Sequence, residues 1–147
     1  MFEGEYNVSL DDKGRVSIPA PYREALRRGY DDLRLVVTRD YDGCISLYPP
    51  REWERTVLAE VRRRPFNDPW ARALQSFMIS AAVTCTPDRQ GRIPIAQSLR
   101  AYAQLRKKVV FSGGLTHFQL WDEARRAEKL QRDLEILRAP APPLSVG

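Results

Sequence analysis

The segment DDKGRVSIP at residues 11–19 recurs as DRQGRIPIA at residues 88–96. Extended as far as Arg23 and Arg100, the two copies share five of thirteen residues without a gap, at a constant offset of 77 positions. A loop that is four residues shorter in the second copy follows, and the match then resumes over a pair of hairpin-like segments. A repeat of this kind indicates that the chain contains the same structural unit twice.

Each copy predicts the same order of elements. Apolar and polar residues alternate at residues 6–10 and 83–85, which is typical of a half-buried strand. A glycine turn, a second short strand, a short helix and a hairpin follow, with the hairpin turns at residues 42–43 and 113–114. Strands this short cannot bury themselves alone. We therefore expect an α+β, β-rich fold in which the duplicated units form a shared small β-barrel with short connecting helices.

Proline and aspartate mark the limits of three further helices. The first begins at Pro50 and ends before Pro65, the second begins after Asp68, and the third begins after Asp122. Apolar spacing in the third favours packing on the protein over a free coiled coil, and the tail from Ala139 onward is predicted to be disordered. This divides the chain into a first unit at residues 5–53, connecting helices at residues 54–80, a second unit at residues 81–126, and a C-terminal helix and disordered tail at residues 127–147.

Composition limits the classes of function. The 147-residue chain has a formal net charge of +5 and a pI of about 9.5, which suits a polyanionic partner without being diagnostic of one. Cys44 and Cys85 form no CxxC pair and are expected to be reduced, buried thiols. The single histidine, His117, has no metal-ligand neighbours at the usual spacing, and no phosphate-binding glycine motif or nucleophile elbow is present. We therefore expect no enzymatic activity, no catalytic residues, no metal and no cofactor.

The chain also shows no signal peptide and no apolar run long enough to span a membrane. We therefore expect a cytoplasmic protein with no membrane partner.

The repeated Asp-x-x-x-Arg pattern carries the candidate chemistry. Arginine can bind a phosphate, or the O6 and N7 atoms of guanine, with two hydrogen bonds, and the preceding glycine allows close approach of the backbone. The aspartate can orient the arginine or hold the turn. An ion pair that only stabilises the fold explains the same pattern and, without context, is favoured. The candidate DNA-binding residues are Asp11, Lys13, Gly14, Arg15, Asp88, Arg89 and Arg92.

Other basic residues are better explained structurally. The run Arg62-Arg63-Arg64 is typical of a solvated helix end. Arg23 and Arg100 occupy matching helix positions and are expected to make internal pairs rather than base contacts.

Several motifs together resemble the MraZ family. They are MFxGEY at residues 1–6, LDDKGRVSIP at 10–19, TRxxDGCIxLYP at 38–49, DRQGRIxI at 88–95 and FQLWD at 118–122. The resemblance covers roughly residues 1–130. It implies two SpoVT-AbrB-like units and a ring-shaped homo-oligomer. It also implies a nucleoid-associated transcriptional regulator that binds direct repeats upstream of its own operon, in the division and cell-wall gene cluster.

The resemblance assigns DNA contact to the Asp-x-x-x-Arg pairs, Asp11 with Arg15 and Asp88 with Arg92. Its partners would be double-stranded DNA and further copies of the chain, with no small-molecule substrate. The second copy has Pro94 where the family places its proline two residues later, as Pro19 is placed in the first copy. We therefore expect the first copy to be the main reader of DNA and the second to be mainly its structural counterpart.

Three alternatives remain open. An antitoxin-like protein would need an acidic or apolar disordered tail to occupy a toxin, and the short Pro-rich tail counts against it. A scaffold ring without DNA binding differs by not being retained on operator DNA. An enzyme is least favoured, for want of a site.

Overall fold

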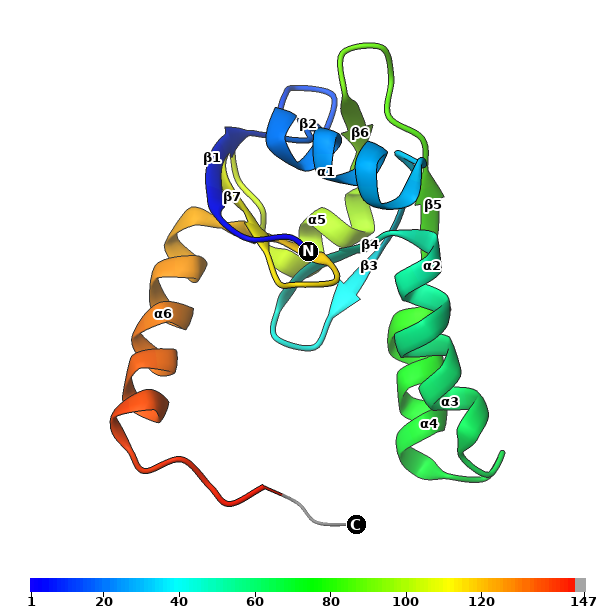
Figure 1. The fold of residues 1–147 in the computed structure, drawn as a ribbon. Coiled ribbons are helices and arrows are strands. Elements are labelled where there is room, and N and C mark those ends of the chain that lie inside the picture. Colours follow the sequence, from blue (N-terminus) through cyan, green and yellow to red (C-terminus); the bar gives the residue numbers. More distant parts are fainter. Residues whose placement is uncertain (145–147) are drawn as a thin grey trace.

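The structure is a computed structural model that describes residues 1–144. Residues 145–147, the end of the predicted tail, lie outside the described residues. A six-stranded antiparallel sheet with the order β1-β7-β8-β4-β3-β5 forms the centre (Figure 1). Its strands are β1 (Glu5–Ser9), β3 (Leu35–Asp40), β4 (Cys44–Tyr48), β5 (Val83–Cys85), β7 (Lys108–Gly113) and β8 (Phe118–Asp122). A separate two-stranded ribbon pairs β2 (Arg15–Ser17) with β6 (Arg92–Pro94).

The two units exchange strands. Strand β1 of the first unit pairs with β7 of the second, and β5 of the second pairs with β3 of the first. The hairpins β3–β4 and β7–β8 meet at the centre of the sheet through β4 and β8. Strands β1, β3 and β4 of the first unit correspond to β5, β7 and β8 of the second. Once corresponding strands are interchanged, the order is the same from either edge of the sheet, as expected for two copies related by an approximate two-fold axis.

The predicted shared β-barrel is not confirmed, because the sheet is open. The edge strands β1 and β5 each pair with one neighbour and not with each other. Strands β2 and β6 do not extend the sheet to close it, since they pair with one another in the separate ribbon. The coarser prediction of an α+β, strand-rich fold built from two units is confirmed.

The main core lies between the ribbon, the sheet and two short helices, α1 (Ala20–Tyr30) and α5 (Gln97–Ala103). Val16 and Ile93 turn one face of the ribbon into this core and are 1% and 0% exposed. Burial of each such side chain contributes about 1.5–3 kcal/mol. The ribbon is therefore fixed to the fold by its inner face, which leaves its outer face for other contacts.

A helical arm projects from the far side of the sheet (Figure 1). Its first half consists of α2 (Pro50–Trp53), the π-helical stretch η1 (Glu54–Leu58) and α3 (Ala59–Arg63). Its second half consists of α4 (Pro69–Leu74) and η2 (Gln75–Ile79). The helix starts predicted at Pro50 and after Asp68 are confirmed, and the Asp68 carboxylate accepts the Ala71 N–H at 3.0 Å. The two halves share a second, smaller core.

The last helix, α6 (Glu123–Arg138), begins after Asp122, as predicted, and buries none of its residues. Its apolar residues Leu130, Leu134 and Leu137 are all exposed. The predicted packing face of this helix therefore has no partner within the described chain. Residues 139–144 adopt neither helix nor strand and are exposed. No helix in the described chain has the length and apolar character needed to cross a bilayer.

Candidate nucleic-acid interface

The Asp11 carboxylate organises the turn between β1 and β2. Its Oδ1 atom accepts the backbone N–H groups of Lys13 at 2.9 Å and Arg15 at 2.8 Å, and its Oδ2 atom accepts Nε–H of Arg15 at 2.8 Å. The backbone closes the turn with Asp11 N–H donating to Arg15 O and Gly14 N–H donating to Asp11 O. Gly14 has a φ of +75°, which favours glycine. One carboxylate therefore fixes both the turn and the direction of the arginine.

The second turn repeats this arrangement. Asp88 accepts the N–H groups of Gln90 and Arg92 at 2.9 Å each and Nε–H of Arg92 at 2.9 Å. Gly91 has a φ of +76°. The two copies thus hold their arginines in the same way, and the local sequence change at Pro94 does not alter how Arg92 is held.

The ribbon places both arginines on one exposed face. In the antiparallel register Arg15 lies opposite Pro94, and Ser17 lies opposite Arg92. These four residues share a face, since side chains alternate along a strand, and the intervening Val16 points into the core. Arg15 and Arg92 are diagonal neighbours, with Cα atoms roughly 7–8 Å apart.

Pro94 fits the ribbon because its nitrogen is not needed for pairing. Ile18 N–H donates to Gly91 O and Ile95 N–H donates to Gly14 O, which marks these as the hydrogen-bonded pairs. Since such pairs alternate with non-hydrogen-bonded pairs in an antiparallel ladder, Pro94 stands at a position whose N–H would point away from the partner strand. The displaced proline therefore leaves the ribbon intact.

Each turn is covered by an arginine of the other unit. A Cβ atom at Gly14 would clash with Nη1 of Arg100, and one at Gly91 would lie 2.8 Å from Cδ of Arg23. Arg23 also donates from Nε to Ile18 O at 3.1 Å. Both arginines lie against the turns as expected, but the expected internal pairs do not form: Arg23 bonds to a backbone carbonyl, and Nε of Arg100 is buried without a hydrogen-bond partner in the described chain. The glycines are needed for this close packing as well as for their φ angles.

The electrostatics of the turns favour ionised carboxylates. The backbone N–H of Arg15 is the largest cause that lowers the pKa of Asp11 below its ordinary value of 3.8, and the Arg15 guanidinium adds to the effect. The Arg92 N–H lowers the pKa of Asp88 in the same way. Within residues 1–144, the Nη atoms of Arg15 and Arg92 donate no hydrogen bond. Each guanidinium is therefore anchored through Nε while its outer edge remains available to a ligand.

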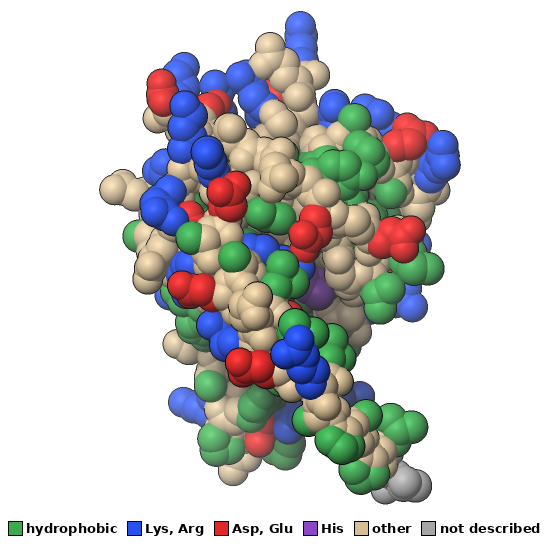
Figure 2. All heavy atoms as spheres, turned by 90° about the vertical axis from the view of Figure 1, so that its left-hand side faces the viewer, with side chains coloured by type: hydrophobic (Ala, Val, Ile, Leu, Met, Phe, Trp, Pro, Cys, Tyr) green, Lys and Arg blue, Asp and Glu red, His purple; other side chains and the backbone are tan. Residues whose placement is uncertain are grey.

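The other candidate residues flank these arginines. Lys13 and Arg89 are exposed at the tips of the two turns, and neither forms an ion pair within the described chain. Lys and Arg side chains gather at the end of the molecule that carries the turns, at the top of Figure 2, with some acidic groups among them. Lys13 and Arg89 thus extend the surface that the paired arginines form.

The arginine run at residues 62–64 has a structural role. Arg62 pairs with Glu54, while Arg63 and Arg64 both pair with Glu60. These ion pairs lie at the end of the helical arm, away from the ribbon in Figure 1. The interpretation as a solvated helix end is confirmed.

Sequence reasoning missed Ser17 and did not foresee that the two turns meet on one ribbon. Ser17 is exposed on the same face, two residues after Arg15 on β2 and directly opposite Arg92 on β6. The alternation of Val16, Ser17 and Ile18 could have indicated its outward position. Nothing in one copy of the repeat indicates that β2 pairs with β6 of the other copy.

The two cysteines are buried and the single histidine is half-buried. No cluster of three His, Cys, Asp or Glu side chains suited to a metal ion occurs within residues 1–144. Burial raises the pKa of both thiols, Cys44 and Cys85, which makes them poor nucleophiles. Burial also lowers the pKa of His117.

Comparison with known proteins agrees with the resemblance seen in the sequence. The family model described as "MraZ protein, putative antitoxin-like" matches residues 1–77 and again residues 78–139. A protein of Solidesulfovibrio magneticus named transcriptional regulator MraZ is 42% identical over 132 residues, covering 90% of this chain and 86% of the relative. Relatives of the same name from Thioalkalivibrio sulfidiphilus and Pediococcus pentosaceus are 45% and 41% identical, over 84% and 92% of this chain and 81% and 90% of their own lengths. The chain therefore belongs to the MraZ family.

Proposed function

We propose that this protein is a sequence-specific DNA-binding transcriptional regulator of the division and cell-wall gene cluster. It binds direct repeats upstream of its own operon as a ring-shaped homo-oligomer, associated with the nucleoid in the cytoplasm. The observation that carries the proposal is the pair of arginines on the outer face of the β2–β6 ribbon. Arg15 and Arg92 are each anchored through Nε, and their Nη atoms point to no partner among the described residues.

The ribbon suits the shape of DNA. The major groove of B-DNA admits a two-stranded β-ribbon, and arginine is well matched to the O6 and N7 atoms of guanine. The Asp11 and Asp88 carboxylates reduce the freedom of the two arginines before binding, which lowers the entropy lost on contact. Lys13 and Arg89 would contact phosphates, which position the protein without reading sequence.

The proposed assembly explains why the sites would be direct repeats. Head-to-tail contacts in a ring present each ribbon in the same sense, whereas a two-fold dimer would suit a palindrome. One small ribbon makes few contacts and should bind weakly. Several ribbons on one ring gain affinity through their high effective concentration.

We further propose that the sequence divisions keep distinct roles. Residues 5–53 and 81–126 act as the two SpoVT-AbrB-like units, with the first as the main reader of DNA, residues 54–80 act as connecting helices, and the chain from residue 127 to 144 serves as a C-terminal extension. The exchange of strands between the two units supports treating them as one body in binding.

The test is a mobility-shift assay with the DNA upstream of the protein's own gene. Arg15→Ala should abolish the specific complex and leave the size-exclusion profile unchanged, because the side chain lies outside the core. Arg62→Ala removes the same charge at the far end of the helical arm and should bind like the unaltered protein. Unchanged binding by Arg15→Ala would overturn the proposal, and no retention of the unaltered protein would favour a scaffold ring instead.

Salt dependence provides a second measure of the same proposal. Phosphate contacts release counterions, so affinity should fall steeply as salt rises. A flat response between low and physiological salt would exclude phosphate contact as the basis of binding.

A further inference from the structure

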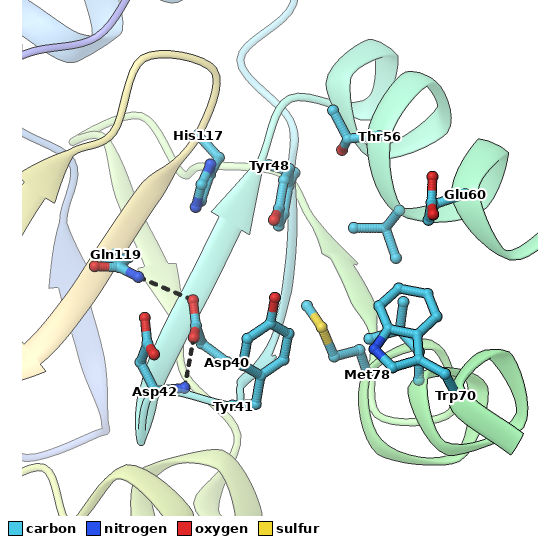
Figure 3. Close-up of a pocket in the computed structure, with 12 residues that line it drawn as sticks. Asp40, Tyr41, Asp42, Tyr48, Thr56, Glu60, Trp70, Met78, His117 and Gln119 are labelled. Carbon is cyan, nitrogen blue, oxygen red and sulfur yellow. Dashed lines mark hydrogen bonds between the residues drawn. The ribbon is translucent and has the colours of Figure 1, made fainter. Parts of the chain in front are cut away.

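An aromatic groove lies between the β3–β4 hairpin and the helical arm. Two adjoining hollows, of about 300 and 350 Å³, share Tyr41, Trp70 and Leu74 as walls. Figure 3 shows Tyr41 and Trp70 in the first hollow with the ring of Tyr48 beyond them. Phe77 continues the apolar wall in the second. The groove is therefore lined by aromatic rings from both the hairpin and the arm.

Two of these rings are more exposed than large aromatic side chains usually are. Tyr41 is 71% exposed and Trp70 is 44% exposed. The Arg64 guanidinium lies over the Trp70 ring, 4.4 Å from its centre, within the range of a cation–π interaction. Large aromatic residues gathered around an open groove are typical of binding surfaces, where they offer broad contact area at little cost in side-chain entropy.

One end of the groove is acidic. Asp40, Asp42 and Glu60 line the first hollow. The Asp40 carboxylate is occupied, since it accepts hydrogen bonds from Ser46 and Gln119, and Glu60 pairs with arginines of the arm. The exposed Asp42 carboxylate accepts no hydrogen bond and forms no ion pair within residues 1–144. It is therefore the acidic group available to a cationic partner.

The segment at the end of α6 has the complementary chemistry. Arg138 is followed by the sequence APAPPL at residues 139–144, all of it exposed. Ala139 has φ −80° and ψ 154°, close to the polyproline II conformation that the following prolines favour. Arg138 forms no ion pair within the described chain. Proline-rich segments in this conformation dock into aromatic-lined grooves and lose little entropy on binding.

We propose that residues 138–144 of one copy dock into the aromatic groove of a second copy. The prolines lie against Tyr41 and Trp70, and Arg138 faces Asp42. Helix α6 leaves the fold beside β7 and β8, on the opposite half of the sheet from the arm (Figure 1). Figure 2 shows the helix and tail projecting from the body with hydrophobic side chains exposed.

This contact rests on the proposed function, because it would be one of the contacts between neighbouring subunits of the proposed ring. The tail and the groove are different surfaces at separate places on the chain. Each copy would give its tail to one neighbour and receive the tail of another, which is the head-to-tail arrangement that closes into a ring.

Disulfide trapping between two full-length chains tests the proposal. One chain, with its own tag, carries Ala73→Cys in the groove wall, and a second, differently tagged chain carries Leu144→Cys. Burial raises the pKa of the native Cys44 and Cys85 thiols, so they compete little for oxidation. After mixing and mild oxidation, we expect a disulfide between the two tagged chains on a non-reducing gel.

Matched variants separate recognition from mere proximity. Trp70→Ala should lower the yield of the mixed disulfide by about tenfold, as expected for a central aromatic anchor. Phe66→Ala removes a ring that is 89% exposed and does not line the groove, and should leave the yield unchanged. Replacing Pro142 and Pro143 by alanine should also lower the yield, and cannot unfold a protein in which this segment is fully exposed.

Three results would overturn the docking. They are the absence of a mixed disulfide, a yield that Trp70→Ala leaves unchanged, and a yield that the proline variant leaves unchanged. The DNA assay with Arg15→Ala is independent of this one. Loss of trapping with intact DNA binding therefore overturns only the tail contact, whereas trapping without DNA binding overturns the proposed function and leaves the contact standing.

Discussion

The turn that carries Arg15 and the turn that carries Arg92 match hydrogen bond for hydrogen bond, yet they differ at the two exposed positions before the glycine. The first has Asp12 and Lys13, whose formal charges cancel. The second has Arg89 and an uncharged glutamine, which leaves one positive charge. The aspartate, the glycine and the arginine therefore set the shape of each turn, while the two residues between the aspartate and the glycine determine how the charge of the two turns differs. Loss of the lysine does not by itself make the second turn less attractive to DNA.

Removal of the two arginines, one at a time, has the largest expected effect on this comparison. A bidentate contact contributes about 1–3 kcal/mol and a ring repeats it. Because the sequence assigns the main readout to the first copy, Arg15→Ala should weaken specific DNA binding by at least about a hundredfold and Arg92→Ala by about tenfold. Fluorescence anisotropy with operator DNA measures both. Equal losses would show that the turns share the readout, and a larger loss for Arg92→Ala would reverse their assigned roles.

Substitution of the two turn glycines should affect stability, and here the larger effect is expected in the second turn. Gly91→Ala is expected to lower the free energy of unfolding by about 1–3 kcal/mol because of its positive φ and its contact with Arg23, which is bonded to Ile18 O. Gly14→Ala should cost about 1 kcal/mol, since it meets the flexible end of Arg100. Urea unfolding measures the difference. Arg100→Ala should relieve part of the loss in the Gly14 variant, and no relief would argue against the crossed packing.

Substitutions at Lys13 and at the matching Gln90 should have a smaller effect, which should appear in the salt dependence of DNA binding. Lys13→Gln should reduce the slope of log affinity against log salt by about one for each ribbon that contacts DNA. Gln90→Lys should increase it by a similar amount. A slope that neither variant changes would remove the turn tips from the phosphate contacts.

Acid should have the smallest effect, and it should reduce the stability contributed by the two turns to the same degree. The pKa values of Asp11 and Asp88 are lowered in the folded chain, mainly by backbone N–H groups. The folded state therefore binds these protons less readily than the unfolded state. Their stabilising contribution is complete above the ordinary value of 3.8 and is lost as the pH falls below it. Asp11→Asn and Asp88→Asn should each flatten the acid end of the stability profile, and a change seen with only one of them would contradict the equivalence of the turns.

The repeat and its periodicity predicted much of the fold. Alternation of apolar residues placed the strands, and Pro50, Asp68 and Asp122 placed the helix starts, because these signals act within a few residues. Which strand pairs with which could not be read in the same way. Two similar copies leave open whether a strand pairs within its own unit, so the exchange of β1 and β5 was not foreseen, and the predicted barrel did not follow.

The sequence identified the residues of the candidate site, but it did not predict how they are arranged in space. The aspartates, glycines and arginines stand in matching columns of the repeat, so sequence alone singled them out. Their meeting on one face depends on the pairing of β2 with β6. Similarly, the apolar spacing of α6 indicated a packing surface, but the same spacing results whether the partner is the same chain or another.

The pairing of β1 with β7 sets the order in which the molecule can assemble as it is synthesised. Glu5 pairs with Ser112, near the other end of the chain. The first strand to leave the ribosome must therefore wait for one of the last, while the local hairpin β3–β4 can form early. Folding dominated by such distant contacts is slow. A nascent chain interrupted before β7 would leave β1 unpaired and exposed to a matching strand of another copy.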